Sequence, residues 1–397
     1  MSDDTTRASV GLLDIATQLP AVLADTPAIV RGLVTGFGAR PAAKTSIGKV
    51  FQDRAIQYAD KIFLKFEDQQ LTYRQANETV NRYAAVLAAR GVGHGDVVGI
   101  MLRNSPDAVL LMLATVKCGA VAGMLNYNQR GNVLAHSFGL LDAKAVVAET
   151  DLIDAIGESG AEVNGLMTLD DLRQLALTAP TTNPAATAAV LAKDKAFYIF
   201  TSGTTGMPKA VRHTHGGFAT AIRHWRDALG LTATDRMQIM TPPSHILGLL
   251  NIATVLDTGA WMRLHRRFDI DTMLGHIQAD RITVEMAVAP IALAVAKHPA
   301  LESYDLSSLR YIMWCATPVT KSIADAVTER VGVQWVSAYG ASELPVIACC
   351  PIGDPRLDTV GKPVPGVAVR IAETGEIQVR SESAMVGYLP AADTESA

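Results

Sequence analysis

From about residue 51 onwards, short apolar runs alternate with longer segments of helical periodicity. The apolar runs of the first half have the length and composition of buried strands and lie at 62–66, 97–101, 121–125 and 144–148. Between the first two lies a helical segment, 74–90, which stops at Gly91. Alternation of this kind predicts a mostly parallel sheet covered by helices, so we expect an α/β fold.

Composition narrows the class of protein further. A chain of 397 residues, of which 49% are hydrophobic and 19% charged, favours a compact protein of more than one domain or subdomain, with much buried sheet. The net charge of −4 gives no overall attraction to nucleic acid. The apolar stretch 109–125 is interrupted by Lys117 and Gly119, which fits a helix followed by a strand better than a membrane span.

Four cysteines lie in apolar settings without the spacing of metal ligands: Cys118, Cys315, Cys349 and Cys350. Two of them are adjacent in sequence and form a poor disulfide pair. We therefore expect reduced thiols in a cytoplasmic protein. An amphipathic stretch at 10–40 leaves two interpretations open, either a helical lead packed on the main body or a face that rests on a membrane.

One polar loop follows the apolar run 197–200 and suits a phosphate group. It reads Thr201-Ser202-Gly203-Thr204-Thr205-Gly206-Met207-Pro208-Lys209. Small residues let backbone N–H groups approach a ligand, hydroxyls add donors, and the lysine adds charge. The loop is not a Walker P-loop, since no Lys-Ser or Lys-Thr follows its last glycine at the required place. The alternative is a polar surface turn, but the whole pattern behind a strand favours a nucleotide.

Three further loops follow expected strands in the second half of the chain. They are Pro242-Pro243-Ser244-His245, Cys315-Ala316-Thr317-Pro318 and Tyr339-Gly340-Ala341-Ser342-Glu343. Ligands of open α/β sheets bind outside the carboxyl ends of the strands, so we expect these loops to converge with the polar loop. Alone, His245 could be structural and Glu343 a solvated carboxylate.

Together, these loops resemble the motifs of the adenylate-forming superfamily, which comprises acyl- and aryl-CoA synthetases, peptide-synthetase adenylation domains and luciferases. Residues 1–210 resemble long- and very-long-chain fatty acid–CoA ligases in particular. The part after Lys209 is more similar to medium-chain or aryl CoA ligases. Such enzymes activate a carboxylate with ATP, release pyrophosphate and usually pass the acyl group to a thiol. The resemblance implies a large N-terminal domain with two layered α/β subdomains and an incomplete β-rich piece.

The resemblance also implies roles for individual residues. Nucleotide binding would fall to Thr201, Ser202, Gly203, Thr204, Thr205, Gly206, Lys209, Ala316, Thr317, Tyr339, Gly340, Ala341 and Ser342. The acyl pocket would be lined by His245, Ile246, Leu247, Leu249, Ala287 and Ala289. Lys209, His245 and Glu343 would take part in catalysis, with Glu343 as the Mg²⁺ ligand. Ser342 replaces the family's threonine but keeps its hydroxyl.

The resemblance also predicts how the chain is divided into subdomains. We expect a helical lead at 1–50, a first α/β subdomain at 51–190, a second with the polar loop at 191–345, and an incomplete β subdomain at 346–397. The family's small mobile C-terminal domain, with its lysine needed for adenylation, has no match here. We therefore expect weak nucleotide binding and slow or absent turnover.

The predicted function is ATP-dependent conversion of a carboxylic acid, expected to be a medium- to very-long-chain fatty acid, to an acyl-adenylate and then an acyl-CoA. The predicted cofactors are ATP, Mg²⁺ and coenzyme A. The partners would be these small molecules, without nucleic acid, and peripheral membrane contact through 10–40 is left open. One alternative is a non-catalytic protein that binds an acyl group or a nucleotide. A kinase is another, and it would transfer a γ-phosphate without releasing pyrophosphate.

Overall fold

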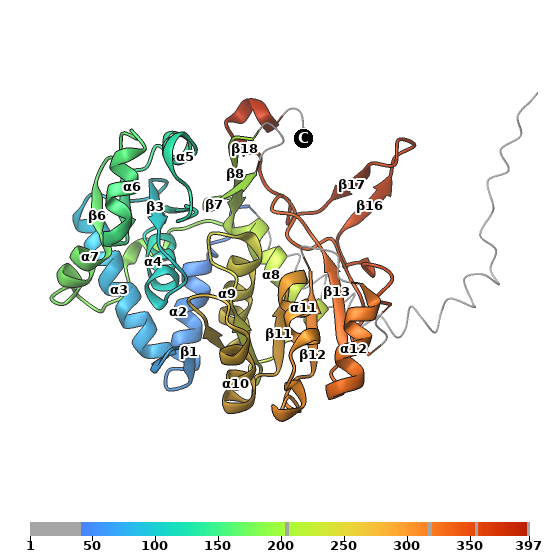
Figure 1. Cartoon of the computed structure of the whole chain (residues 1–397). Coiled ribbons are helices and arrows are strands. Elements are labelled where there is room, and N and C mark those ends of the chain that lie inside the picture. Colours follow the sequence, from blue (N-terminus) through green and yellow to red (C-terminus); the bar gives the residue numbers. More distant parts are fainter. Residues whose placement is uncertain (1–40, 203–205, 316–319, 354–355, 395–397) are drawn as a thin grey trace, which may run out of the picture.

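The computed structural model describes residues 41–202, 206–315, 320–353 and 356–394, with Ser202 described by its backbone alone. The segment 10–40, predicted to form a helical lead, lies outside these ranges. In the described part, most strands form two large sheets flanked by helices (Figure 1). The predicted α/β class is therefore confirmed.

The larger sheet has nine strands and a parallel centre. Its order is β15 (Lys362–Pro363), β14 (Ala348–Cys349), β13 (Trp335–Tyr339), β12 (Tyr311–Trp314), β11 (Val284–Ala287), β9 (Arg236–Ile239), β10 (Trp261–Leu264), β1 (Ile62–Phe66) and β2 (Gln69–Thr72). The strands β2, β14 and β15 are antiparallel to their neighbours.

The second sheet has seven strands, in the order β18 (Tyr388–Leu389), β8 (Pro208–Thr214), β7 (Lys195–Ser202), β4 (Val121–Met124), β3 (Val97–Met101), β5 (Ala145–Ala148) and β6 (Leu166–Thr168). Five of them are parallel, while β8 and β18 extend the sheet in antiparallel fashion.

Three hydrophobic clusters arrange these sheets and the helices in layers. The cluster between the sheets holds α2 (Ile47–Gln57), α3 (Tyr73–Ala89), α4 (Pro106–Lys117), α7 (Leu169–Ala176), α8 (His215–Leu229) and α9 (Ile246–Thr258). The far face of the larger sheet is covered by α10 (Ile270–Asp280), α11 (Ala289–Lys297) and α12 (Lys321–Val331). The far face of the smaller sheet is covered by α5 (Gly131–Leu141) and α6 (Ile153–Glu158). Each parallel sheet is thus buried on both faces.

Sheet membership departs from the predicted subdivision at two places. The hairpin β1–β2, expected in the first subdomain, pairs with the larger sheet, where Leu64 lies beside Met262. The hairpin β7–β8, expected to open the second subdomain, pairs with the smaller sheet, where Phe197 lies beside Ala122. An apolar run marks a buried strand but does not determine its neighbour, and this explains both departures.

Local sequence signals account for the ends of several helices. Thr72 begins α3 with a capping box, in which its hydroxyl accepts from the backbone of Gln75 and the Gln75 side chain accepts from the backbone N–H of Thr72. Ser105 caps α4 in front of Pro106. Both helices begin at or within one residue of where the sequence predicted them.

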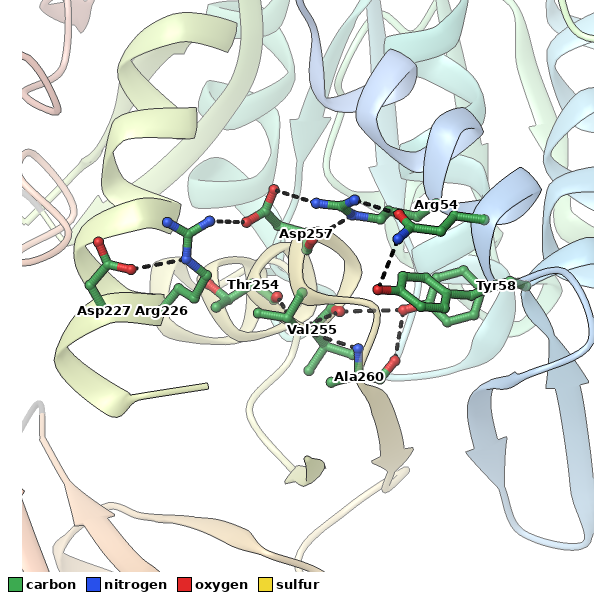
Figure 2. Close-up of polar contacts among 11 residues, drawn as sticks. Arg54, Tyr58, Arg226, Asp227, Thr254, Val255, Asp257 and Ala260 are labelled. Carbon is green, nitrogen blue, oxygen red and sulfur yellow. Dashed lines mark hydrogen bonds and ion pairs between the residues drawn. The ribbon is translucent and has the colours of Figure 1, made fainter. Parts of the chain in front are cut away.

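The helix α9 is fixed at its C-terminal end by side chains from three other helices (Figure 2). The guanidinium of Arg54 donates from Nε to the Asp257 carbonyl at 2.6 Å, and Arg226 Nη1 lies 3.0 Å from Asp257 Oδ2. The phenol of Tyr73 donates to the Ala260 carbonyl just beyond the helix at 2.7 Å. The Arg54 bond satisfies a carbonyl in the last turn, and the three contacts together hold the C-terminal end of α9 in place.

The strands β16 (Ala368–Ile371) and β17 (Ile377–Arg380) form a separate hairpin that projects from the body (Figure 1). Its cross-strand pairs Val369–Val379 and Ile371–Ile377 are exposed. All four cysteines are buried free thiols. Among the helices of the described ranges, none has the length and apolar character needed to span a bilayer.

Candidate functional site

A pocket of about 190 Å³ opens beside the carboxyl ends of the parallel strands β12 and β13. Its lining comprises Trp225, His245, Ile246, Leu247, Leu250, Cys315, Ala338, Tyr339, Gly340, Ala341, Ser342 and Pro345. The residues come from α8, from the N-cap and first turns of α9, from the loop after β12, and from the end of β13 with the loop that follows it. The predicted convergence of the His245 loop with the loop 339–343 is therefore confirmed.

His245 is the N-cap residue of α9, directly before Ile246, and its ring caps the helix. Its Nδ1 accepts a hydrogen bond from the backbone N–H of Leu247 at 3.2 Å, so the neutral ring carries its proton on Nε2. Surrounding protein atoms lower the pKa of His245 below its ordinary value, which favours this neutral form. His245 can thus offer a neutral N–H donor to a ligand in the pocket.

The helix can begin here because Gly248 lies against the preceding loop. A Cβ on Gly248 would lie 2.1 Å from the carbonyl oxygen of Pro242. Only glycine permits this approach, which lets the first turn of α9 lie against the loop at Pro242.

The loop after β13 is held by backbone bonds and by one buried histidine. The N–H of Ala341 donates to the Leu344 carbonyl at 3.0 Å, and that of Ile347 donates to the Tyr339 carbonyl at 2.9 Å. From β8, His213 Nε2 donates to the Ser342 carbonyl at 2.8 Å. Burial lowers the pKa of His213 to about 4, so the ring stays neutral near pH 7. His213 therefore joins the loop to the smaller sheet.

The polar loop connects β7 to β8, and Lys209 at its described end lies over Tyr388, which binds Glu343 in the loop after β13. Thr201 pairs with Lys209 across the hairpin, and Gly206 has a φ of +86°, which favours glycine. Lys209 Nζ lies 3.4 Å from Asp393 Oδ2 and 5.4 Å from the centre of the Tyr388 ring. The predicted binding residues Gly203, Thr204 and Thr205 lie outside the described residues, as do Ala316 and Thr317.

Tyr388 connects the polar loop to the loop after β13. Its phenol donates to Glu343 Oε1 at 2.6 Å, and the Met385 N–H donates to the Glu343 carbonyl at 2.7 Å. Burial and the adjacent carboxylate both raise the pKa of the Tyr388 phenol, so it remains a donor. Two of the predicted catalytic residues, Lys209 and Glu343, therefore interact with the same side chain, that of Tyr388.

The donor set can be tested against a magnesium ion. Within the described ranges, no cluster of three or more His, Cys, Asp or Glu side chains could enclose a metal. Mg²⁺ commonly takes one or two carboxylates and fills its remaining positions with phosphate oxygens and water. A single carboxylate at Glu343, close to the polar loop, fits that kind of site.

The predicted acyl residues fall into two groups. His245, Ile246 and Leu247 line the pocket. Leu249 and Ala287 are buried in the core, Ala289 begins α11, and none of the three lines the pocket as described, so their role stays a prediction. Sequence reasoning missed Tyr388, Asp393, His213 and Trp225, whose partners lie far away in the chain.

The fold and this site define an α/β protein of the adenylate-forming class. The chain belongs to the AMP-binding enzyme family, which matches residues 51–389. It is 51% identical over 342 residues to the medium/long-chain-fatty-acid–CoA ligase FadD6 of Mycobacterium tuberculosis, a match that covers 84% of this chain and 57% of FadD6. The match thus spans little more than half the length of this curated relative.

Solved structures share the fold. The N-terminal domain of FACL13 from Mycobacterium tuberculosis superposes with a TM-score of 0.82 at 22% identity, covering 89% of this chain and 93% of that domain. The ATP-bound MatB from Rhodopseudomonas palustris gives a TM-score of 0.79 at 25% identity, covering 89% of this chain and 74% of MatB. The resemblance to the adenylate-forming superfamily is therefore confirmed, as is the predicted type of domain.

Proposed function

We propose that this chain binds ATP and a fatty acid beside Lys209, Glu343 and His245 and activates the fatty acid as an acyl-adenylate, which then passes to the thiol of coenzyme A. The observation that carries the proposal is that Lys209 and Glu343 both contact Tyr388, next to a pocket that His245 lines. The name of FadD6 supports a medium- or long-chain acid, and the ATP-bound state of MatB supports the nucleotide.

In the proposed reaction, a carboxylate oxygen attacks the α-phosphorus of ATP. The bond from that phosphorus to the bridging oxygen breaks, and pyrophosphate leaves with the electron pair. Lys209 would hold phosphate oxygens, and the Nε2–H of His245 would orient the carboxylate. When bound, Mg²⁺ would neutralise phosphate charge, with Glu343 as its protein ligand. The thiol would then lose its proton to solvent, and its sulfur would form a bond to the acyl carbon. The bond from that carbon to the phosphate oxygen would break, and AMP would leave with the electron pair.

This proposal needs no side-chain nucleophile, because the substrate carboxylate attacks directly. The neutral state of His245 suits a positioning donor better than a general acid. The buried thiols support a reducing, cytoplasmic location as part of the same proposal.

The test combines binding with turnover on the full chain. Calorimetry would measure the affinity for Mg·ATP and for a non-reactive acyl-sulfamate mimic of the adenylate. Fatty-acid-dependent exchange of pyrophosphate into ATP would measure activation. We expect saturable binding of both ligands and exchange with a fatty acid. Binding without exchange would identify the non-catalytic alternative, and ADP formation without pyrophosphate would identify a kinase.

A matched pair of variants localises the site. Lys209→Met should weaken Mg·ATP binding by about tenfold or more, since a charge-assisted bond to phosphate contributes roughly 1.5–3 kcal/mol. Lys193→Met removes an exposed lysine that precedes β7 and should leave the affinity unchanged. Equal effects of the two substitutions would contradict the placement of the nucleotide.

A further inference from the structure

The largest buried side chain in the wall of the pocket is that of Trp225, from α8. The indole is 2% exposed and lies among much smaller wall residues, including Cys315 and Ala338. Because the pocket has a volume of only about 190 Å³, the position of one indole strongly affects how long a ligand the pocket can hold.

The indole is locked in its orientation by a residue on the neighbouring helix. Trp225 Nε1 donates to Asn251 Oδ1 at 2.8 Å, and Asn251 is fully buried. The Asn251 Nδ2 finds no hydrogen-bond partner in the described part of the chain. Burying an amide N–H group without a partner lowers the stability of the fold. We therefore infer that the contribution of Asn251 is its hydrogen bond to Trp225.

The position of Asn251 places the indole relative to the carboxylate end of the pocket. Asn251 lies between one and two turns beyond His245 on α9, which is about 9 Å along the helix axis at roughly 1.5 Å per residue. Ile246, Leu247 and Leu250 line the wall between them. An acyl chain whose carboxylate lies at His245 and whose tail runs along α9 would therefore reach Trp225 with its far end.

We propose that Trp225, held by Asn251, is a specificity-determining residue that closes the deep end of the acyl pocket and limits the length of the fatty acid. This inference rests on the proposed function. A chain shorter than the limit gains affinity with each methylene buried. A longer chain must displace the indole, which breaks its bond to Asn251 and leaves a second buried group unpaired.

The experiment measures affinity against chain length. Acyl-sulfamate adenosine mimics with chains from six to eighteen carbons would be titrated calorimetrically into the 397-residue chain. For the unmodified protein, affinity should rise roughly fourfold per methylene group up to a break length and then fall. In Trp225→Ala the break should move to chains at least four carbons longer, with Mg·ATP affinity unchanged.

Two further variants keep the test decisive. Trp225→Leu retains an apolar side chain in the core and should also lengthen the accepted chain. Asn251→Leu leaves the indole in place but removes its hydrogen bond. The loss of affinity for chains beyond the break length should then be at least threefold smaller than in the unmodified protein. A break that stays at the same length in the Trp225 variants, while Mg·ATP still binds, would overturn the inference.

A measurement on the unmodified protein does not depend on how the variants fold. With ¹⁵N-labelled tryptophan, the indole N–H resonance of Trp225 should shift only for mimics at or beyond the break length. A resonance that shifts equally with every chain length, or with none, would overturn the inference. Failure of the unmodified protein to bind any mimic or Mg·ATP would instead contradict the proposed function itself.

Discussion

Tyr388 donates its phenolic hydrogen to Glu343 across 45 residues of sequence, with an O···O distance of 2.6 Å. The same ring lies under the ammonium group of Lys209. One aromatic side chain from β18 therefore unites two loops that belong to different sheets. The placement of the predicted phosphate and metal groups depends on this strand, which pairs with β8 through Tyr388 and Leu389.

Removing the Tyr388 hydroxyl should weaken the attachment of β18 to the loop after β13. In Tyr388→Phe, we expect the free energy of unfolding to fall by about 1–2 kcal/mol, since a hydrogen bond to a charged group is lost at a partly buried site. Urea unfolding at pH 7 measures it. Tyr339→Phe is the control, because Tyr339 is 37% exposed at the pocket rim, and it should change stability by less than about 0.5 kcal/mol. Equal losses in both would contradict the assignment.

Asp393 places a carboxylate on the lysine that we expect to hold phosphate. The pair lies 3.4 Å apart and is partly exposed, so its contribution is of the order of 0.2–1 kcal/mol. If phosphate must replace this carboxylate, Asp393→Asn should raise the affinity for Mg·ATP by about two- to fivefold, measured by calorimetry. A lower affinity would mean that Asp393 instead orients Lys209 for the nucleotide.

Gly340 should tolerate no larger residue. A Cβ there would lie 2.1 Å from the carbonyl oxygen of Pro345, so the loop must move. Gly340→Ala should lower the free energy of unfolding by about 1–3 kcal/mol and weaken Mg·ATP binding. Gly139→Ala on α5 is the matched control, because a Cβ there meets nothing within 4 Å and a helix gains from the change. Similar losses in both variants would contradict this account.

A buried carboxyl group predicts the pH dependence of stability. Glu285 on β11 lies fully within the protein and accepts from Gln238 Nε2 at 2.9 Å. Burial raises the pKa of Glu285 from 4.5 to about 8. The folded state therefore binds the proton more tightly than the unfolded state, so this group costs stability as the pH rises from about 4.5 to 8.

The isosteric variant Glu285→Gln removes that cost. It should raise the free energy of unfolding at pH 7 by about 3 kcal/mol, and by little at pH 4.5, because a shift of one pKa unit corresponds to about 1.4 kcal/mol. Urea titrations at several pH values test this. A variant whose stability gain does not grow between pH 4.5 and 7 would show that Glu285 does not carry this proton.

The sequence predicted those parts of the fold that local patterns determine. The runs at 62–66 and 97–101 are strands with the predicted bounds, and Ser105 with Pro106 begins a helix as expected. Strand neighbours could not be predicted, because the pairing of Leu64 with Met262 depends on packing between distant segments. The site follows the same rule. His245 and Glu343 could be predicted because each lies in a recognisable motif. The bond of Tyr388 to Glu343 could not, because no local pattern around Tyr388 indicates a partner so distant in sequence.

The contacts of Arg54 and Arg226 with Asp257 have a consequence for the proposed substrate preference. Arg54 and Arg226 hold Asp257 near the C-terminal end of α9, and His245 caps its N-terminal end. The helix whose first turns line the pocket is therefore held at both ends. If the proposed function holds, exchanging single side chains in these first turns would alter which acid is accepted, while the backbone of α9 and the proposed nucleotide contacts stay in place.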